Sequence, residues 1–363
     1  MYDLIREDTL YIMLYAVVTV MALMASCYLL FRQGNAFAAT ITPPARLRRW
    51  TAAFFAAFVL NHVWYLPIFF LSSSEDVRTF DLIGGLLDSM TIFPLAIIVL
   101  LTMLQDRKRP LWPVIVMMAP LIIGAAFSVA TRSYLLQTIA YIYFLLMCMG
   151  IIIYMVREQR QYGRWLRDNY ADLEHKEVWQ SFVVLTIILL VFVIYAFVSE
   201  GLVYLYAMQV IIIVLICYLL WRVETLSDLS IPVNDEEEEM QKSPLTIRNQ
   251  IGPLLKKYCE EPQLYLQYDI SLTQLAKTIG TNRLYLSQYF SNQGITYNVY
   301  INTLRIQHFI NLYHENATAL QSTTVQQLAY QSGFRSYSTF NAAFKQNMGM
   351  TATEWMNNKA ELK

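Results

Sequence analysis

The sequence predicts an all-α protein, in which a bundle of seven membrane-spanning helices is followed by a smaller soluble helical domain. Apolar residues make up 56% of the 363-residue chain and charged residues 15%, whereas soluble domains have roughly 45–50% and about 25%. Seven long apolar runs precede residue 222, and from Leu245 onward the apolar residues are spaced as in amphipathic helices. We therefore divide the chain into a membrane domain at 1–221, an acidic flexible linker at 222–244 and a soluble domain at 245–363.

The apolar runs are the predicted spans, because a helix needs about 20 mostly apolar residues to cross about 30 Å of hydrocarbon. Pro113 and Pro120 interrupt the fourth run, but membrane helices tolerate proline where neighbouring groups satisfy the freed carbonyls. The first run is longer than the core of a signal peptide and follows an acidic tail, so we expect an uncleaved span. The seven predicted spans are Thr9–Phe31, Thr51–Leu71, Leu82–Leu104, Leu111–Ala130, Tyr134–Val156, Ser181–Ser199 and Leu202–Trp221.

Basic residues in the loops orient this bundle, because Lys and Arg stay on the cytoplasmic side during insertion. The loops after the first, third and fifth spans carry twelve of them. The N-terminal tail and the other loops between spans carry only Arg6, Arg78 and Arg132. We therefore expect the N-terminus outside the cell and everything after Trp221 in the cytoplasm.

Polar side chains inside the spans are costly in hydrocarbon, so each is a candidate for function. His62 in the second span and Asp88 in the third lie about 13 Å and about 9 Å below the outer loop that both spans share. They are candidate sensor residues, which would titrate or bind a ligand from outside. The alternative is that they only form hydrogen bonds between helices. The outer loop at Glu200 and Gly201 is a tight hairpin, so an external ligand would have to be small or dissolved in the membrane.

Two polar stretches allow two interpretations each. Residues Arg157–Gln180 mix charged and aromatic side chains, and they form either a connector along the membrane surface or a docking surface for the C-terminal domain. The linker at 222–244 has a net charge of −5 and contains an acidic run from Asp235 to Glu239. It is either a solvated spacer or an inhibitory strip that competes with an anionic partner for the C-terminal domain, whose net charge is +4.

The C-terminal domain contains the pattern of a helix-turn-helix unit twice. In the first unit, Gly280 ends an amphipathic helix and Asn282 can cap the next one. The same layout recurs after Val325, where Gly333 ends a helix and Ser336 can cap its successor. The second helix of each unit would expose one polar face, as a helix that lies in a major groove does. The exposed faces consist of Arg283, Leu284, Ser287, Gln288 and Ser291 in the first unit and of Tyr337, Ser338, Asn341, Ala342 and Lys345 in the second.

A third amphipathic pattern, Tyr297–His314, predicts a helix that connects the two units. A helix of this length, about 27 Å, can hold two reading helices at a separation near one turn of DNA, which is about 34 Å. We interpret Arg305 in this helix as part of a structural ion pair in preference to a base contact. The predicted fold class is therefore all-α, a polytopic seven-helix membrane bundle followed by a cytoplasmic all-α domain with two helix-turn-helix units.

Residues that mark a known family recur across both units. They are Leu275-Ala276, Gly280, Leu286, Phe290, Gly294, Tyr300-Ile301, Leu304-Arg305, Ala329, Gly333-Phe334, Ser336, Phe340, Phe344-Lys345, Gly349 and Glu354-Trp355. On these residues the stretch from about Ile270 to Trp355, about a quarter of the chain, resembles the DNA-binding domain of the AraC/XylS family of bacterial transcription regulators. The resemblance implies that bases are read by Leu284, Ser287, Gln288, Tyr337, Ser338, Asn341 and Ala342.

The sequence departs from this family in four places. Ala352 and Met356 stand where the family usually has Pro and Arg. Gln288 and Ala342 stand where Arg is common, so both units lack a bidentate contact to guanine. We expect the second unit to contact mainly phosphates, through Lys345. Because a net charge of +4 is low for a lone DNA binder, tight binding should need a dimer or repeated sites.

The resemblance and the hydropathy together imply a membrane-bound one-component transcription regulator of a bacterial cytoplasmic (inner) membrane. Its expected partners are promoter DNA, the lipid bilayer, a second copy of the chain, and a small or membrane-soluble ligand. The membrane domain either senses a signal or only tethers the chain. The alternative is a membrane receptor or transporter with a regulatory cytoplasmic tail. The four cysteines lie far apart and no metal-binding or catalytic motif occurs in the sequence, so we expect no metal, no cofactor and no enzymatic activity.

Overall fold

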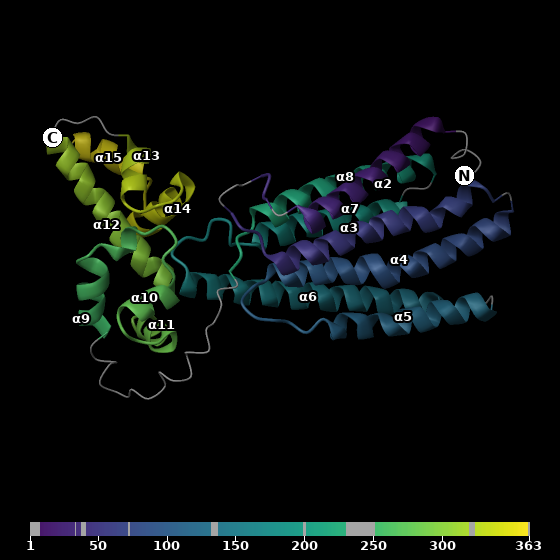
Figure 1. Cartoon of the computed structure of the whole chain (residues 1–363), viewed down its shortest axis with the longest axis horizontal. Coiled ribbons are helices and arrows are strands. Elements are labelled where there is room, and N and C mark those ends of the chain that lie inside the picture. The colour runs from purple at the N-terminus through teal and green to yellow at the C-terminus, as the bar shows by residue number, and fades with distance from the viewer. Residues whose placement is uncertain are drawn as a thin grey trace. The chain divides into compact units, whose positions relative to one another are not determined.

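The computed structural model describes residues 8–32, 34–37, 41–71, 73–131, 137–198, 201–229, 251–318 and 324–361. These residues form helices joined by turns, with one isolated β-bridge and no sheet among them. The chain divides into two compact units (Figure 1). One unit comprises Met1–Tyr162 and Val178–Ser230, and the other comprises Gly163–Glu177 and Ile231–Lys363.

The first unit is built from long helices that run side by side (Figure 1). They are α2 (Thr9–Phe31), α3 (Ala45–Tyr65), the short 3-10 helix η1 (Leu66–Phe69), α4 (Ser74–Met103), α5 (Trp112–Thr131), α6 (Gln137–Asn169), α7 (Trp179–Val198) and α8 (Leu202–Thr225). Five helices of the described part are long and apolar enough to cross a membrane. Helices α5 and α7 are apolar over shorter segments, Trp112–Gly124 and Trp179–Ile188. Each predicted span falls largely on one of these helices.

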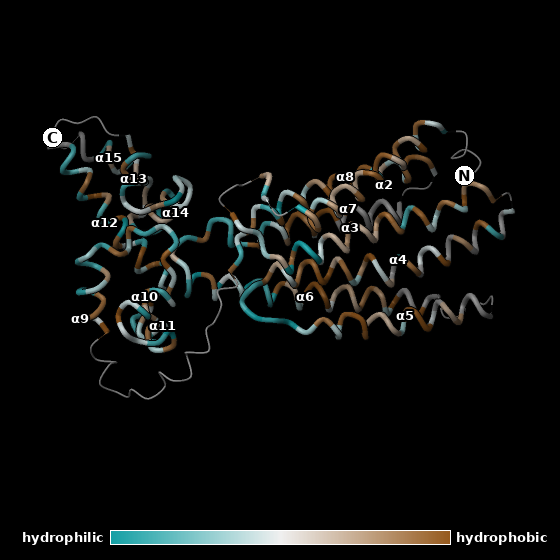
Figure 2. The backbone as a smooth tube through the Cα atoms, in the orientation of Figure 1, coloured by the Kyte–Doolittle hydropathy of each residue, from teal (hydrophilic) through white to brown (hydrophobic). Residues whose placement is uncertain are grey.

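Packing in the first unit buries both small and large side chains and leaves many large apolar ones exposed. Helix α2 packs against α3 and α8, α3 against α4, α4 against α5, and α7 against α8. Ala22 and Ala52 are buried, and the hydroxyl of Ser26 donates to the carbonyl oxygen of Ala52 at 2.9 Å. Met24 and Ile153 point outward, with 67% and 62% of their surface exposed. Apolar residues continue along these helices (Figure 2), so the first unit exposes many large apolar side chains.

The chain stays attached to the first unit after α8 ends. The amide of Asp228 donates to the carbonyl oxygen of Thr42 at 2.9 Å. The side chain of Gln105 donates to the carbonyl of Ser227 at 3.0 Å and accepts from the amide of Leu229 at 2.8 Å. The predicted linker therefore begins with residues that are packed in this unit.

The second unit contains the last residues of α6, the loop after it and a domain of short helices. Residues 230–250, with the acidic run of the predicted linker, lie outside the described residues. The elements that follow are α9 (Ile251–Leu255), the π-helical turn η4 (Lys256–Glu260), the 3-10 helix η5 (Leu264–Leu266), α10 (Leu272–Thr278), α11 (Arg283–Asn292), α12 (Tyr297–Thr318), α13 (Val325–Gln331), α14 (Tyr337–Met348) and α15 (Ala352–Glu361).

Side-chain caps set the starts of the helix pairs α10–α11 and α13–α14. Ser271 and Thr324 begin α10 and α13 with the same capping box, a reciprocal pair of hydrogen bonds with the glutamine three residues later. Asn282 caps α11 by accepting from the amide of Tyr285 at 2.8 Å. Ser336 caps α14 in the same way. Both caps that the sequence predicted, Asn282 and Ser336, are confirmed.

Two separate hydrophobic cores lie along α12. Tyr297 and Ile301 belong to the first core, with residues of α10 and α11. Ile306 and Phe309 belong to the second core, with residues of α13, α14 and α15. Helix α12 thus connects the two helix pairs, as expected, and it extends beyond the predicted end to Thr318.

Candidate nucleic-acid interface

The predicted reading face of the first helix pair lies on α11 and is open to solvent. Leu284 is 73% exposed and Gln288 is exposed, while Ser287 is half-buried. On the opposite face Leu286 and Phe290 are buried in the first core. Burial of that face orients Leu284 and Gln288 toward solvent.

The corresponding face of the second helix pair lies on α14. Its exposed predicted residues are Ser338, Ala342 and Lys345, and its half-buried ones are Tyr337 and Asn341. Phe340 and Phe344 are fully buried and anchor the helix in the second core. The ring of Tyr337 stacks on that of Phe340, with centroids 5.8 Å apart. Tyr337 therefore contributes to packing as well as to the exposed face.

Arg283, at the start of α11, is engaged by another part of the second unit. Its Nε donates a hydrogen bond to the amide oxygen of Asn169 at 2.7 Å. Asn169 is the last residue of α6, and its own amide donates to the carbonyl of Trp165 at 2.6 Å, which fixes its orientation. The sequence does not predict this contact, because 114 residues separate the two side chains and no local pattern marks it.

The loop after α6 continues this contact along the C-terminal domain. Tyr170 and Ser271 form an isolated antiparallel bridge. The side-chain amide of Asn298, on α12, donates to the carbonyl oxygens of Tyr170 at 3.2 Å and Ala171 at 2.5 Å. Ala171 is fully buried in the first core. Of the two interpretations of Arg157–Gln180, these contacts favour a docking surface for the part from residue 169 onward.

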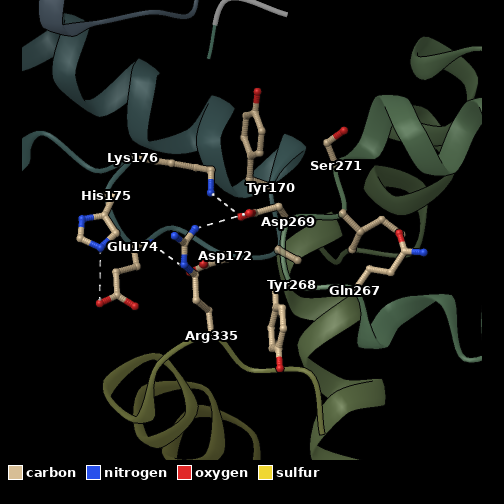
Figure 3. Close-up of polar contacts among 12 residues, drawn as sticks. Tyr170, Asp172, Glu174, His175, Lys176, Gln267, Tyr268, Asp269, Ser271 and Arg335 are labelled. Carbon is tan, nitrogen blue, oxygen red and sulfur yellow. Dashed lines mark hydrogen bonds and ion pairs between the residues drawn. The ribbon is translucent and has the colours of Figure 1, made fainter. Parts of the chain in front are cut away.

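Asp269 lies between two cations, one from this loop and one from the second helix pair (Figure 3). Its Oδ1 is 3.4 Å from Nζ of Lys176, and its Oδ2 is 3.4 Å from Nη1 of Arg335. The carboxylate of Asp172 is buried near Lys176, and burial raises the pKa of this carboxyl while the lysine charge opposes the shift. The loop, the segment before α10 and the segment before α14 therefore meet at Asp269.

Arg305 has a structural role, but its partners are backbone carbonyls. It is buried on α12, and its Nε donates to the carbonyl of Tyr265 at 2.8 Å while Nη2 donates to that of Gln267 at 2.7 Å. Its guanidinium also lies 5.6 Å from the centre of the Phe334 ring. Burial lowers the pKa of Arg305 to about 10. The expected ion pair is therefore replaced by hydrogen bonds that fix the segment between η5 and α10.

The two candidate sensor residues of the first unit have separate partners. His62 is buried, with Nδ1 2.8 Å from the carbonyl oxygen of Phe58 and Nε2 3.1 Å from Oε1 of Gln209 on α8. Asp88, on α4, accepts hydrogen bonds from three donors on α3, which are Asn61 at 2.7 Å, Trp64 at 3.2 Å and Tyr65 at 3.2 Å. Within the described residues, no hydrogen bond or ion pair joins His62 to Asp88, and each connects α3 to another helix.

Among the described residues, no group of three or more His, Cys, Asp or Glu side chains lies close enough together to hold a metal ion. The cysteines are free thiols, and only Cys259 is buried.

Comparison with known proteins identifies the C-terminal region. Residues 275–358 match the family described as "Helix-turn-helix domain". The match begins in α10 and ends in α15, so it includes both helix pairs and the connecting α12. The chain therefore carries a region that matches a helix-turn-helix domain near the end of the described residues.

Curated proteins are similar to this chain over the same region. The TCP pilus virulence regulatory proteins of two strains of Vibrio cholerae serotype O1, one classical and one El Tor, are each 33% identical over 78 residues. The similarity covers 22% of this chain and 26% of each relative, so the chain spans about a quarter of the length of the curated relatives it matches. No solved structure gives a significant match.

Proposed function

We propose that this chain is a membrane-bound one-component transcription regulator, in which the C-terminal domain binds promoter DNA and the apolar helices hold it at a bacterial cytoplasmic membrane. One observation carries the proposal. The same chain contains a helix-turn-helix domain at 275–358 and, before it, five helices that are apolar and long enough to cross a membrane. The relatives named as regulatory proteins support the transcriptional role of this domain.

On the DNA side, each helix pair acts as a helix-turn-helix unit that lies in a major groove. The open faces of α11 and α14 support this role, with Leu284 and Gln288 reading bases in the first unit and Ser338 in the second. Lys345 is exposed and provides a phosphate contact. The modest net charge of the domain supports binding as a homodimer or at repeated sites.

On the membrane side, seven spans place the N-terminus outside and the C-terminal domain in the cytoplasm. Helices α5 and α7, together with the five long apolar helices, supply the seven spans of this proposal. The basic loops after the first, third and fifth spans support the orientation. A sensing role belongs to the polar contacts of His62 and Asp88, because a ligand that displaces Gln209 or Asn61 would change how α3 packs against its neighbours.

Chromatin immunoprecipitation with sequencing tests this proposal, with tagged full-length protein expressed from its native locus. We expect a few sharp promoter peaks that share a site of two boxes about one DNA turn apart. The matched control is the double variant Gln288→Ala, Lys345→Ala, which should keep its membrane localisation and lose the peaks. A wild-type protein that is present in the membrane yet enriches no promoter under several growth conditions would instead support a receptor or transporter with a regulatory tail.

The sensing role is tested in the same cells. Variants His62→Ala and Asp88→Asn should keep the promoter peaks and alter the response of the target genes to growth conditions. If both variants respond as the wild type does, the membrane domain is a tether and the polar contacts only hold its helices together.

A further inference from the structure

The loop after α6 is an acidic segment that lies against the DNA-binding domain. Residues Asn169–Glu177, named here the docked segment, carry three acidic side chains and one lysine, a net charge of −2 with His175 neutral. The segment belongs to the same compact unit as the helix-turn-helix domain. Its ends are held by the bridge from Tyr170 to Ser271 and by the ion pair from Lys176 to Asp269. Docking thus brings a segment of net negative charge against the domain that we propose binds DNA.

Arg283 belongs to this docking contact and to the proposed DNA-reading helix. It is the only cationic residue of α11, and it occupies the first position of that helix. An arginine that binds phosphate or guanine in bidentate fashion uses two neighbouring N–H donors. The Nε donor at 2.7 Å from Asn169 cannot join an Nη group in a side-on contact with DNA at the same time, although the Nη1 and Nη2 donors stay available for an end-on contact. Docking and the side-on Arg283 contact with DNA therefore compete.

We propose that the docked segment is an autoinhibitory element, which holds Arg283 and repels DNA until the segment is released. The proposal rests on the DNA binding proposed above. The oxygen of Asn169 is uncharged, so a phosphate, whose negative charge attracts the ionised donor, makes the stronger hydrogen bond and can displace it. Asn169 is also the last residue of α6, whose apolar part is a candidate membrane span, Ile142–Asn169. A movement of that helix therefore acts directly on the contact to Arg283.

The first experiment tests docking without reference to DNA. In full-length protein in lipid nanodiscs, with the native cysteines replaced by serine or alanine, cysteines are introduced by Tyr170→Cys and Ser271→Cys, and a protease site is inserted within residues 230–250. The bridged residues are close enough for a disulfide, because cross-strand neighbours have Cα atoms about 4.5–5.5 Å apart. We expect the C-terminal fragment to stay covalently attached after cleavage and to be released by reductant. Failure of this disulfide to form would overturn docking and the proposal with it.

The second experiment measures DNA affinity of the same disulfide-bonded protein before and after reduction. The probe is a fluorescent 40-base-pair duplex that contains a promoter site recovered by immunoprecipitation, with a scrambled duplex as control. We expect reduction to raise affinity for the promoter duplex at least about tenfold. The variant with Ser271→Cys alone should not respond to reductant. Equal affinity of the locked and reduced forms, or tighter binding by the locked form, would overturn autoinhibition.

A matched pair of substitutions isolates the Arg283 contact. Asn169→Ala removes the acceptor, and we expect about 2- to 10-fold tighter DNA binding, the equivalent of one hydrogen bond. Asn169→Asp keeps an acceptor and adds charge, so DNA binding should weaken. Loss of both effects in an Arg283→Ala background would confirm that they act through this arginine. Unchanged affinity in both single variants would contradict the proposal.

The outcomes separate this proposal from the proposed function. If the disulfide forms but the reduced protein binds neither duplex, DNA binding fails as a function while docking remains. If the reduced protein binds DNA and the locked protein binds equally well, regulation by the docked segment fails while DNA binding remains.

Discussion

Gly333 lies directly against the backbone of Leu266, and a Cβ atom on Gly333 would approach the Cα of Leu266 to 2.8 Å. Gly333 follows α13 in the second helix pair, and Leu266 ends η5 beside the first pair. The glycine also has a φ of 88°, which L-residues with a side chain rarely adopt. The absence of a side chain at this position therefore lets the two halves of the DNA-binding domain pack together.

We predict that Gly333→Ala destabilises the C-terminal domain by about 2 to 4 kcal/mol, from the positive φ and the collision with backbone atoms together. The measurement is proteolysis of full-length protein in nanodiscs across a urea series, read at a C-terminal tag. Gly349→Ala is the control, because Gly349 has a φ of 76° but no atom within 4 Å of its Cβ position. The Gly349→Ala substitution should lower the free energy of unfolding by only about 1 to 2 kcal/mol. Equal effects of the two substitutions would show that the contact with Leu266 adds nothing.

Arg305 fixes the same region from inside. We predict that Arg305→Leu destabilises the domain by about 3 to 5 kcal/mol, because the carbonyls of Tyr265 and Gln267 lose charged donors in a buried site. Arg305→Lys should recover part of this loss, since one ammonium group cannot reproduce the two guanidinium contacts. The same urea series measures both variants. An Arg305→Leu variant with an unchanged free energy of unfolding would contradict the structural role and would favour a contact of Arg305 with DNA.

Cys259 provides a test of the first core that depends on pH. It is fully buried, and burial raises the pKa of its thiol from an ordinary value of 9 to about 12. Because the thiolate is the reactive form, a maleimide at pH 8 should label Cys259 about a thousandfold more slowly than an exposed thiol. The variant with the other three cysteines replaced by serine is labelled in nanodiscs and followed by mass spectrometry. Rapid labelling in the absence of urea would show that this core is open.

The raised pKa of Cys259 makes the free energy of unfolding depend on pH. The folded thiol keeps its proton to higher pH than the unfolded thiol, so the stabilising contribution is complete below pH 9 and is lost as pH rises from about 9 to about 12. The Cys259→Ala variant should lack this decline. Its urea midpoint, compared with that of the parent at pH 8 and pH 10, checks the sign.

Lys345 and Gln288 should affect DNA binding in different ways. Lys345→Ala should weaken binding to all duplexes alike and reduce the salt dependence of log K by about one phosphate contact, roughly 0.9. Gln288→Ala should leave that slope unchanged and cost about 1 to 3 kcal/mol only at one base pair of the promoter site. Fluorescence anisotropy between about 50 and 200 mM salt separates them. A uniform loss from Gln288→Ala would argue against base reading by α11.

Local chemistry explains what the sequence could predict. Helix starts at Asn282 and Ser336 and the turns at Gly280 and Gly333 depend on residues within a few positions of one another, so their signals are visible in the sequence. Burial of Phe340 follows equally from helical spacing. The exposed faces of the second helices are then fixed, because each is opposite a buried one.

Contacts between distant residues could not be predicted in this way. Arg283 and Asn169 meet although neither belongs to a pattern that includes the other. Arg305 was expected to pair with a carboxylate, but backbone carbonyls are present in every segment and leave no mark in the sequence. Likewise, similar depths in the sequence suggest that His62 pairs with Asp88, whereas the hydrogen bond from its side chain to another helix goes to Gln209 on α8.

The two cores on α12 have a consequence for how the domain opens. Tyr297 and Phe309 belong to different clusters of buried residues, so the two halves are separate cooperative units that share one helix. Native-state hydrogen exchange should then give amides of α13 and α14 one opening free energy and amides of α10 and α11 another. Contacts between the halves, such as Gly333 with Leu266 and Arg305 with Phe334, couple their opening, and stronger coupling brings the two opening free energies closer together. Local unfolding of one half would remove one of the two proposed reading helices from DNA and leave the other in place.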